Sequence, residues 1–190
     1  MNDFENFFEK ERNLEEILRY QIRNKVKRES VAEHLFHVTL YSMIMCDMEK
    51  SRGAKIDTER VLKTAIIHDL EESETGDVPF VFKHQSDKFE HLVKDMGKDA
   101  IKGIFGKMEN SDEYVKLWAN QKDMDTIEGK IIFAADRLDV LLFAMREKAV
   151  GNNTFDEIMY RVLRGLYDLK LPSLDTILKS LGFEEMYGGG

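Results

Sequence analysis

The sequence predicts an all-α protein that folds as one domain, and three observations favour that class. Only two prolines interrupt the chain of 190 residues. Between them, apolar residues recur at spacings of three and four, which is the period of a helix that faces a core. Hydrophobic residues make up 43% of a chain whose length is usual for one domain, which is enough to build a single core. We therefore expect one domain over residues 1–187 and a flexible glycine tail over 188–190.

The helical period predicts eight helices, at residues 3–20, 31–52, 58–74, 88–105, 111–121, 126–150, 154–169 and 173–181. Asp57 or Thr58 can cap the third helix, because an oxygen-bearing side chain there accepts an unpaired backbone N–H. Gly76, shortly before Pro79, supplies the permissive backbone at which that helix stops.

The sixth expected helix, 126–150, carries apolar residues on nearly every side between Lys130 and Phe143. This pattern is typical of a central helix surrounded by others. Gly151 follows its end, and Thr154 with Glu157 three residues later resembles a capping box that begins the seventh helix. Both features separate the sixth helix from the seventh.

The composition argues against several kinds of partner. A formal net charge of −8 disfavours a broad electrostatic grip on DNA or RNA, whereas one small phosphate ester needs only a local cationic pocket. No apolar run approaches the roughly 18 residues of a membrane-spanning helix, and the acidic N-terminus lacks a signal pattern. We therefore expect a cytoplasmic protein with no membrane and no polymeric nucleic acid as partner. Cys46, the single cysteine, lies in an apolar segment and is expected to be a buried thiol.

The third expected helix carries a polar pair, His68 and Asp69, on a face that should be buried. The two residues continue two apolar series at helical spacing: Val61, Ala65 and His68, and Leu62, Ile66 and Asp69. Burying a carboxylate costs several kcal/mol unless it is compensated, and a divalent cation held also by a neutral histidine compensates it. For this pair alone, a histidine satisfied by a neighbouring carboxylate explains the pattern equally well.

Two further helices place a polar residue among apolar ones, and this favours a shared ion. Asp136 lies within the central helix, and His34 shares a stripe with Val31, Val38 and Tyr41. We therefore predict one divalent ion held by His34, His68, Asp69 and Asp136. Two imidazoles and two carboxylates suit Mn, Co, Fe, Ni, Zn or Mg. Four protein ligands leave room for water on a five- or six-coordinate ion, as hydrolysis requires.

A longer series of motifs resembles one family. The motifs are Arg19-Tyr20, the segments 29–34 (ESVAEH), 68–72 (HDLEE) and 75–79 (TGDVP), Lys83, Ala135-Asp136, and Gly151-Asn152 with Phe155. The order His, His-Asp, Asp is the pattern of HD-domain phosphohydrolases, and the blocks resemble the YfbR-like 5′-deoxynucleotidases over about residues 15–165. The resemblance implies an HD-domain helical bundle around a buried metal site and a homodimer. It also implies hydrolysis of deoxyribonucleoside 5′-monophosphates to deoxynucleoside and phosphate.

The resemblance also implies roles for individual residues. Glu72 is expected to act on the attacking water, Arg19 to bind the phosphate, and Asp77 to lie near the sugar. Lys83 is a candidate for electrostatic support of the substrate. In this family the residue after the phosphate-binding arginine is usually tryptophan, whereas this chain has Tyr20; the smaller ring could relax discrimination against a ribose 2′-hydroxyl.

The residues themselves are compatible with these roles. Glu72 lies four residues after His68 and three after Asp69, so all three share a helix face and Glu72 can reach their water without being a ligand. The planar guanidinium of Arg19 matches phosphate oxygens. Without the resemblance, Arg19 would be read as a surface cation and Asp77 as a turn residue.

Neighbouring polar residues allow weaker predictions. Glu33 could pair with Arg28 or orient His34, and Asp139 could orient a metal ligand. We interpret the remaining histidines as packing or surface residues: His37, His84 and His91.

Two other functions remain open at this point. An HD-domain hydrolase could act on the guanosine alarmone or a cyclic nucleotide, and Glu71-Glu72 loosely resembles the acidic pair of alarmone hydrolases. The segment 75–77 matches the monophosphate enzymes better. A non-catalytic nucleotide-binding regulator would be indicated by a missing ligand, and all four expected ligands are present.

Overall fold

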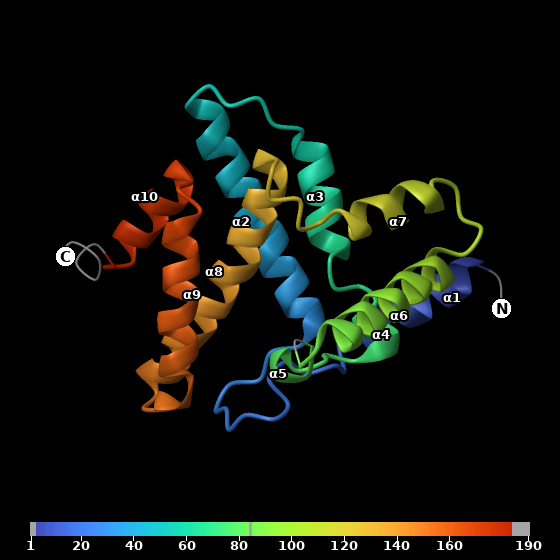
Figure 1. The fold of residues 1–190 in the computed structure, drawn as a ribbon, viewed down its shortest axis with the longest axis horizontal. Helices are drawn as coiled ribbons and strands as arrows, with labels where there is room; N and C mark the ends of the chain where they lie inside the picture. Colours follow the sequence, from blue (N-terminus) through green and yellow to red (C-terminus); the bar gives the residue numbers. More distant parts are fainter. Residues whose placement is uncertain (1–2, 84, 184–190) are drawn as a thin grey trace.

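The computed structural model describes residues 3–83 and 85–183, and all of their regular elements are helical (Figure 1). The all-α prediction is thereby confirmed. The expected tail at 188–190 and His84 lie outside the described residues. The elements in chain order are α1 (Asp3–Asn13), α2 (Val31–Ser51), α3 (Thr58–Ile67), α4 (Glu72–Thr75), α5 (Phe80–Lys83), α6 (Asp87–Phe105), α7 (Ser111–Ala119), α8 (Ile127–Ala149), the 3-10 helix η1 (Asn153–Phe155), α9 (Asp156–Asp168) and α10 (Pro172–Ser180).

Helix α8 is the central element, as its apolar surface predicts. It packs against α2, α3 and α9 (Figure 1), and side chains on several of its sides are fully buried, among them Ile131, Ala134, Ala135 and Leu141. Cys46 on α2 is also fully buried, which confirms the expected buried thiol. Within residues 3–83 and 85–183, no helix is both long and apolar enough to cross a bilayer.

Helix α2 begins at a reciprocal cap. The Ser30 hydroxyl accepts the Glu33 backbone N–H at 3.2 Å, and the Glu33 carboxylate accepts the Ser30 backbone N–H at 2.7 Å. The prediction that Glu33 pairs with Arg28 or orients His34 is wrong, because its carboxylate is engaged at this helix start. The cap fixes the first turn of α2, and His34 lies in that turn with no exposed surface.

The helix expected over 58–74 ends early. Asp57 caps its start by accepting the Arg60 N–H at 3.0 Å, but α3 stops at Ile67 and a turn precedes α4. The His68 carbonyl accepts the Gln121 side-chain amide at 2.9 Å, and the Glu72 N–H bonds to the Asp69 carbonyl at 3.1 Å. A continuous helix would pair the Glu72 N–H with His68 instead. Glu72 therefore does not share a helix face with His68 and Asp69, and that prediction is wrong.

The helix expected over 3–20 ends at Asn13, because the following chain turns back toward α2. Leu18 pairs with Ser30 in an isolated antiparallel bridge, and the Arg19 N–H donates to the Glu29 carbonyl at 2.9 Å. These backbone bonds close a loop over residues 20–28 and hold Arg19 beside the start of α2. The prediction of helix at Arg19 and Tyr20 is wrong for this reason.

The C-terminal end of α8 anchors the tip of the same loop. Glu147, fully buried, accepts the backbone N–H groups of Val26 at 2.8 Å and Lys27 at 2.6 Å. The capping box predicted from Thr154 and Glu157 is absent, since Asn152 accepts the Thr154 N–H at 3.1 Å and α9 begins only at Asp156. Asn152 thus caps the start of η1, two residues before the expected cap at Thr154.

A close backbone approach makes Gly129 essential to the start of α8. A Cβ atom there would lie 2.0 Å from the Asp123 carbonyl oxygen, which is a backbone atom. We expect Gly129→Ala to lower the free energy of unfolding by at least about 1–3 kcal/mol, as overpacking does. Urea denaturation followed by circular dichroism measures this change.

The matched control for Gly129 is Gly165 on α9, around which nothing lies within 4 Å of an added Cβ. Gly165→Ala should raise the free energy of unfolding by about 0.5–1 kcal/mol, because alanine loses less backbone entropy in a helix. Equal stabilities of the two alanine variants would contradict the close approach at Gly129.

Candidate active site

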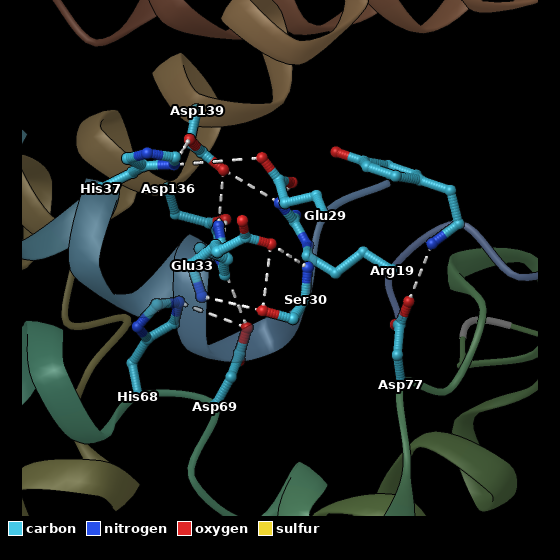
Figure 2. A network of polar contacts seen from close by, with 12 residues as sticks. Arg19, Glu29, Ser30, Glu33, His37, His68, Asp69, Asp77, Asp136 and Asp139 are labelled. Carbon is cyan, nitrogen blue, oxygen red and sulfur yellow. Dashed lines mark hydrogen bonds and ion pairs between the residues drawn. The ribbon is translucent and has the colours of Figure 1, made fainter. Parts of the chain in front are cut away.

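Four polar side chains converge where α2, α8 and the turn after α3 meet. His34 Nε2 lies 3.5 Å from Asp69 Oδ2 and 3.5 Å from Asp136 Oδ1. His68 Nε2 lies 3.3 Å from the same Asp69 oxygen. Ligand atoms of His34, His68 and Asp136 all fall within 4.8 Å of one another. Figure 2 shows His68, Asp69 and Asp136 pointing toward this common centre.

The second nitrogen of each imidazole fixes how the ring is protonated. His34 Nδ1 lies 2.7 Å from Asp139 Oδ2, and His68 Nδ1 lies 2.7 Å from the Ala65 carbonyl oxygen. Both partners can only accept, so each Nδ1 carries a proton and donates it. Both Nε2 atoms are buried and have no hydrogen-bond partner among the described residues. When such a ring is neutral, its Nε2 lone pair faces the carboxylates, an arrangement that can hold a divalent ion.

The two carboxylates of this cluster are less buried than the histidines. His34 and His68 are 0% and 3% exposed, whereas the Asp69 and Asp136 side chains are 23% and 19% exposed. The place of Asp136 in the central helix predicts a buried side chain, and the side chain is only partly buried. Ile66 is also exposed, so the series through Ile66 does not face the core as expected. Asp69 reaches the cluster because α3 ends before it, not because it follows a buried stripe.

The electrostatics of the cluster favour positive charge at its centre. Burial lowers the pKa of His68, but Asp69, Asp136 and the Ala65 carbonyl together outweigh it, so that the value is about 9. Burial raises the pKa of Asp69 and Asp136, yet their cationic neighbours bring both below the usual range. The two carboxylates are thus ionised and attract a proton or a cation to the same place.

A cavity of about 170 Å³ opens beside Asp69 and is lined also by Glu72 and Lys83. Glu72 is almost fully buried. Burial, with Asp69 and Asp77 nearby, raises its pKa well above the usual range. Burial lowers the pKa of Lys83, but the carboxylates of Asp69 and Glu72 outweigh this and raise it. The cavity wall therefore brings the Glu72 carboxyl group and the Lys83 ammonium group close to Asp69.

Arg19 lies on the other side of the cluster, held by two carboxylates. Its Nη1 donates to Glu29 Oε2 at 2.7 Å and to Asp139 Oδ2 at 2.9 Å (Figure 2). Its side chain is 12% exposed. A guanidinium so fixed presents its remaining N–H groups in a defined plane, which suits a planar or tetrahedral anion.

Tyr20 and Asp77 are joined through the backbone. The Tyr20 N–H donates to Asp77 Oδ2 at 3.1 Å. Tyr20 has a φ of 57°, a left-handed conformation that non-glycine residues seldom adopt. Its ring stacks on Phe143 at a centroid distance of 4.6 Å and meets Phe155 edge-on at 5.3 Å. Burial raises the pKa of Asp77, and Arg19 opposes that shift.

Several residues near the site were missed or misread from the sequence. His37, interpreted as packing or surface, has Nδ1 3.3 Å from Asp139 Oδ1 and 3.9 Å from Glu29 Oε1. Its place three residues after His34, on the same face of α2, was the available signal. His91 is exposed, as expected.

The sequence pattern gives Glu71 no role beyond its place in an acidic pair with Glu72. In the structure Glu71 accepts the Trp118 indole N–H at 2.7 Å, a contact between residues distant in the chain. Burial, followed by the Asp69 charge, raises the pKa of Glu71 to about 7. Glu71 therefore lies within the site wall and is bound to α7.

The chain matches the family model described as 5′-deoxynucleotidase YfbR-like over residues 6–182. It is 26% identical over 175 residues to a 5′-deoxynucleotidase of Photorhabdus laumondii subsp. laumondii, covering 91% of this chain and 89% of the relative. A 5′-deoxynucleotidase of Yersinia pestis (strain Pestoides F) is 24% identical over 174 residues, covering 90% and 88%.

The fold is similar to that of a solved HD-domain phosphohydrolase from Listeria innocua. The TM-score is 0.80 at 26% identity, over 93% of this chain and 86% of the Listeria chain. The family match spans nearly all described residues and includes each of the converging side chains. The chain therefore belongs to the YfbR-like 5′-deoxynucleotidase family of HD-domain phosphohydrolases.

Proposed function

We propose that the protein is a metal-dependent phosphoric monoester hydrolase that removes the 5′-phosphate from deoxyribonucleoside 5′-monophosphates. Family membership supports the reaction class and substrate class. The observation that carries the proposal is the pair of buried, unpartnered imidazole nitrogens, His34 Nε2 and His68 Nε2, directed at two carboxylates. Buried polar atoms without partners are costly, and a metal ion would remove that cost.

His34, His68, Asp69 and Asp136 would hold one divalent ion. The separations of 3.3–3.5 Å between their facing atoms suit ligands that each lie about 2.0–2.2 Å from one ion. The carboxylates that raise the pKa of His68 would attract a dication in place of the proton. When bound, such an ion acidifies water and offsets negative charge on phosphoryl oxygens. The donor set suits Mn, Co, Fe, Ni, Zn or Mg.

Glu72 would accept the proton of the attacking water. The attack forms a new P–O bond and breaks the bond between phosphorus and the 5′-oxygen, which leaves with a proton, so that the products are deoxynucleoside and phosphate. Burial beside Asp69 raises the pKa of Glu72, and a carboxylate with a raised pKa is a stronger base than an exposed one. Lys83, which lines the same cavity, would offset the charge of the phosphate.

Arg19 would bind the phosphate oxygens, and Asp77 with Tyr20 would contact the sugar. The two carboxylates on Nη1 hold the guanidinium in one orientation and leave Nη2 and Nε to donate to an anion. Asp77 is fixed by the Tyr20 N–H, so an acceptor for a sugar hydroxyl lies close to the phosphate-binding arginine.

We also propose that the protein acts as a cytoplasmic homodimer, on the basis of the family resemblance. Helix α2 exposes Phe36, Met43 and Ile44 at helical spacing, and a stripe of exposed apolar residues is typical of an association surface. We propose neither a nucleic acid polymer nor a membrane as its partner.

Metal removal tests the proposed reaction. Phosphate release is measured from dAMP, dGMP and dTMP and from the matching ribonucleotides, with chelator-stripped protein and with each divalent ion restored. We expect the stripped protein to be slower by at least about 100-fold, because the ion supplies several kcal/mol of charge stabilisation and each 1.36 kcal/mol is tenfold. We also expect deoxynucleotides to be hydrolysed faster than ribonucleotides.

The same assay separates the alternative functions. Turnover of the guanosine alarmone or a cyclic nucleotide in place of monophosphates would reject the proposed substrate but keep the metal chemistry. Calorimetric binding of the ion without release of phosphate from any substrate would reject hydrolysis and favour a nucleotide-binding regulator.

A further inference from the structure

One carboxylate oxygen lies between the two halves of the proposed site. Asp139 Oδ2 is 2.7 Å from His34 Nδ1 and 2.9 Å from Arg19 Nη1. Asp139 lies on α8, one turn after Asp136, and is 2% exposed. In Figure 2, a dashed line joins the Asp139 carboxylate to the Arg19 side chain. A single buried atom thus receives two hydrogen bonds from groups that come from different elements.

At His34, Asp139 determines which ring nitrogen is free. A carboxylate accepts but does not donate when ionised, so it keeps the proton of the neutral ring on Nδ1. The lone pair of Nε2 then faces Asp69 and Asp136, each 3.5 Å away. A carboxylate behind a ligating histidine also makes the ring a stronger ligand.

At Arg19, the same oxygen determines where the guanidinium lies. Arg19 belongs to the loop that follows α1, and its side chain is held at Nη1 by Glu29 and Asp139. The guanidinium is planar, so fixing one nitrogen restricts the directions of the remaining donors.

We propose that Asp139 is a positioning residue that couples metal binding to phosphate binding, because one carboxylate orients both His34 and Arg19. This inference rests on the proposed roles of those two residues. It predicts that loss of the Asp139 carboxylate weakens the binding of both ligands, although Asp139 would touch neither.

Glu29 provides a matched comparison. It is 4% exposed and accepts from the same Arg19 nitrogen at 2.7 Å, but its described hydrogen bonds and ion pairs do not include His34. Glu29→Gln should therefore weaken phosphate binding and leave metal affinity unchanged. Asp139→Asn should weaken both, because a neutral amide oxygen accepts from His34 and Arg19 less strongly than an ionised carboxylate oxygen does.

The experiment is calorimetric titration of chelator-stripped protein with Mn²⁺, followed by titration of the Mn²⁺-saturated protein with inorganic phosphate. For Asp139→Asn we expect Mn²⁺ affinity to fall about 10- to 100-fold, as for other partners of ligating histidines, and phosphate affinity to fall about tenfold. For Glu29→Gln we expect only the phosphate affinity to fall. Equal Mn²⁺ affinities of Asp139→Asn and Glu29→Gln would overturn the proposal.

A double-mutant cycle with Arg19→Ala separates the two halves of the coupling. In the Arg19→Ala background, Asp139→Asn should still weaken Mn²⁺ binding but should no longer change phosphate binding. Additive losses of phosphate affinity would contradict a role through Arg19. Circular dichroism and thermal melting establish that each variant is folded.

A measurement on the unaltered protein keeps the proposal testable if Asp139→Asn does not fold. Nitrogen-15 NMR of metal-free protein should show a proton on His34 Nδ1, and a ring protonated on Nε2 alone would overturn the inference. These readouts need no turnover. Unaltered protein that binds Mn²⁺ and phosphate but hydrolyses nothing would reject the proposed reaction alone, whereas unaltered protein that binds no Mn²⁺ would reject the coupling as well.

Discussion

Replacing Asp136 with alanine should lower kcat/KM for dAMP by at least about 1,000-fold. Asp136 is one of two carboxylates that face His34 Nε2, so its loss removes a proposed ligand and half of the local negative charge. The bound ion is expected to supply several kcal/mol of stabilisation to the transition state, and each 1.36 kcal/mol is tenfold in rate. Steady-state phosphate release with Mn²⁺ present measures the loss.

Stability measurements distinguish a lost ligand from a damaged fold. Asp136→Ala removes the contact with His34 Nε2 at 3.5 Å but also relieves repulsion from Asp69. The melting temperature in chelator should therefore change little, while the rise that Mn²⁺ gives the unaltered protein should disappear. Asp99→Ala, at a side chain 79% exposed on α6, is the control and should keep both activity and the Mn²⁺-induced rise. Full activity of Asp136→Ala would reject the proposed metal site.

Replacing Glu72 with alanine should lower kcat by about 100- to 10,000-fold, the usual contribution of a positioned base. Glu72 lines the cavity beside Asp69 but makes no contact of the kind that joins the four clustered side chains. Mn²⁺ affinity should therefore stay close to that of the unaltered protein. Single-turnover kinetics with dAMP, together with Mn²⁺ calorimetry, measure the two quantities separately.

Glu74 is the matched control for Glu72 on the same short helix, α4. It is exposed and its described partner is Lys10, 3.4 Å away. Glu74→Ala should keep kcat within about twofold, since surface ion pairs of this kind contribute little. If Glu72→Ala kept full kcat, or lost Mn²⁺ affinity as Asp136→Ala does, Glu72 would not be the proposed base.

The helices were predictable because their burial follows local periodicity, and α2 and α8 match the expected ranges closely. The break between α3 and α4 was not predictable, because it depends on a hydrogen bond from the Gln121 side chain to the His68 carbonyl. The end of α1 similarly depends on pairing of Leu18 with Ser30. Interactions between distant segments override a helical pattern. The periodicity of apolar residues in a single sequence does not reveal such interactions.

The convergence of His34, His68 and Asp136 was predictable for a related reason. A polar side chain on an apolar face needs a buried partner, and three such faces in a small bundle meet at one core. The carboxylates around Arg19 were harder to anticipate. Glu29 gains its contact with Arg19 from a loop that folds back by backbone bonds, and its position in the sequence carries no sign of that contact.

The packing of Tyr20 has a consequence for altering sugar preference. Its ring is wedged between Phe143 and Phe155, and its backbone takes a left-handed turn. A residue so placed is part of the packed interior. Any replacement must fill the same apolar space before it can contribute to nucleoside recognition. A library that seeks activity on ribonucleotides should therefore vary positions 20, 143 and 155 together. A single substitution at position 20 would change sugar selectivity and also lower the stability of the fold.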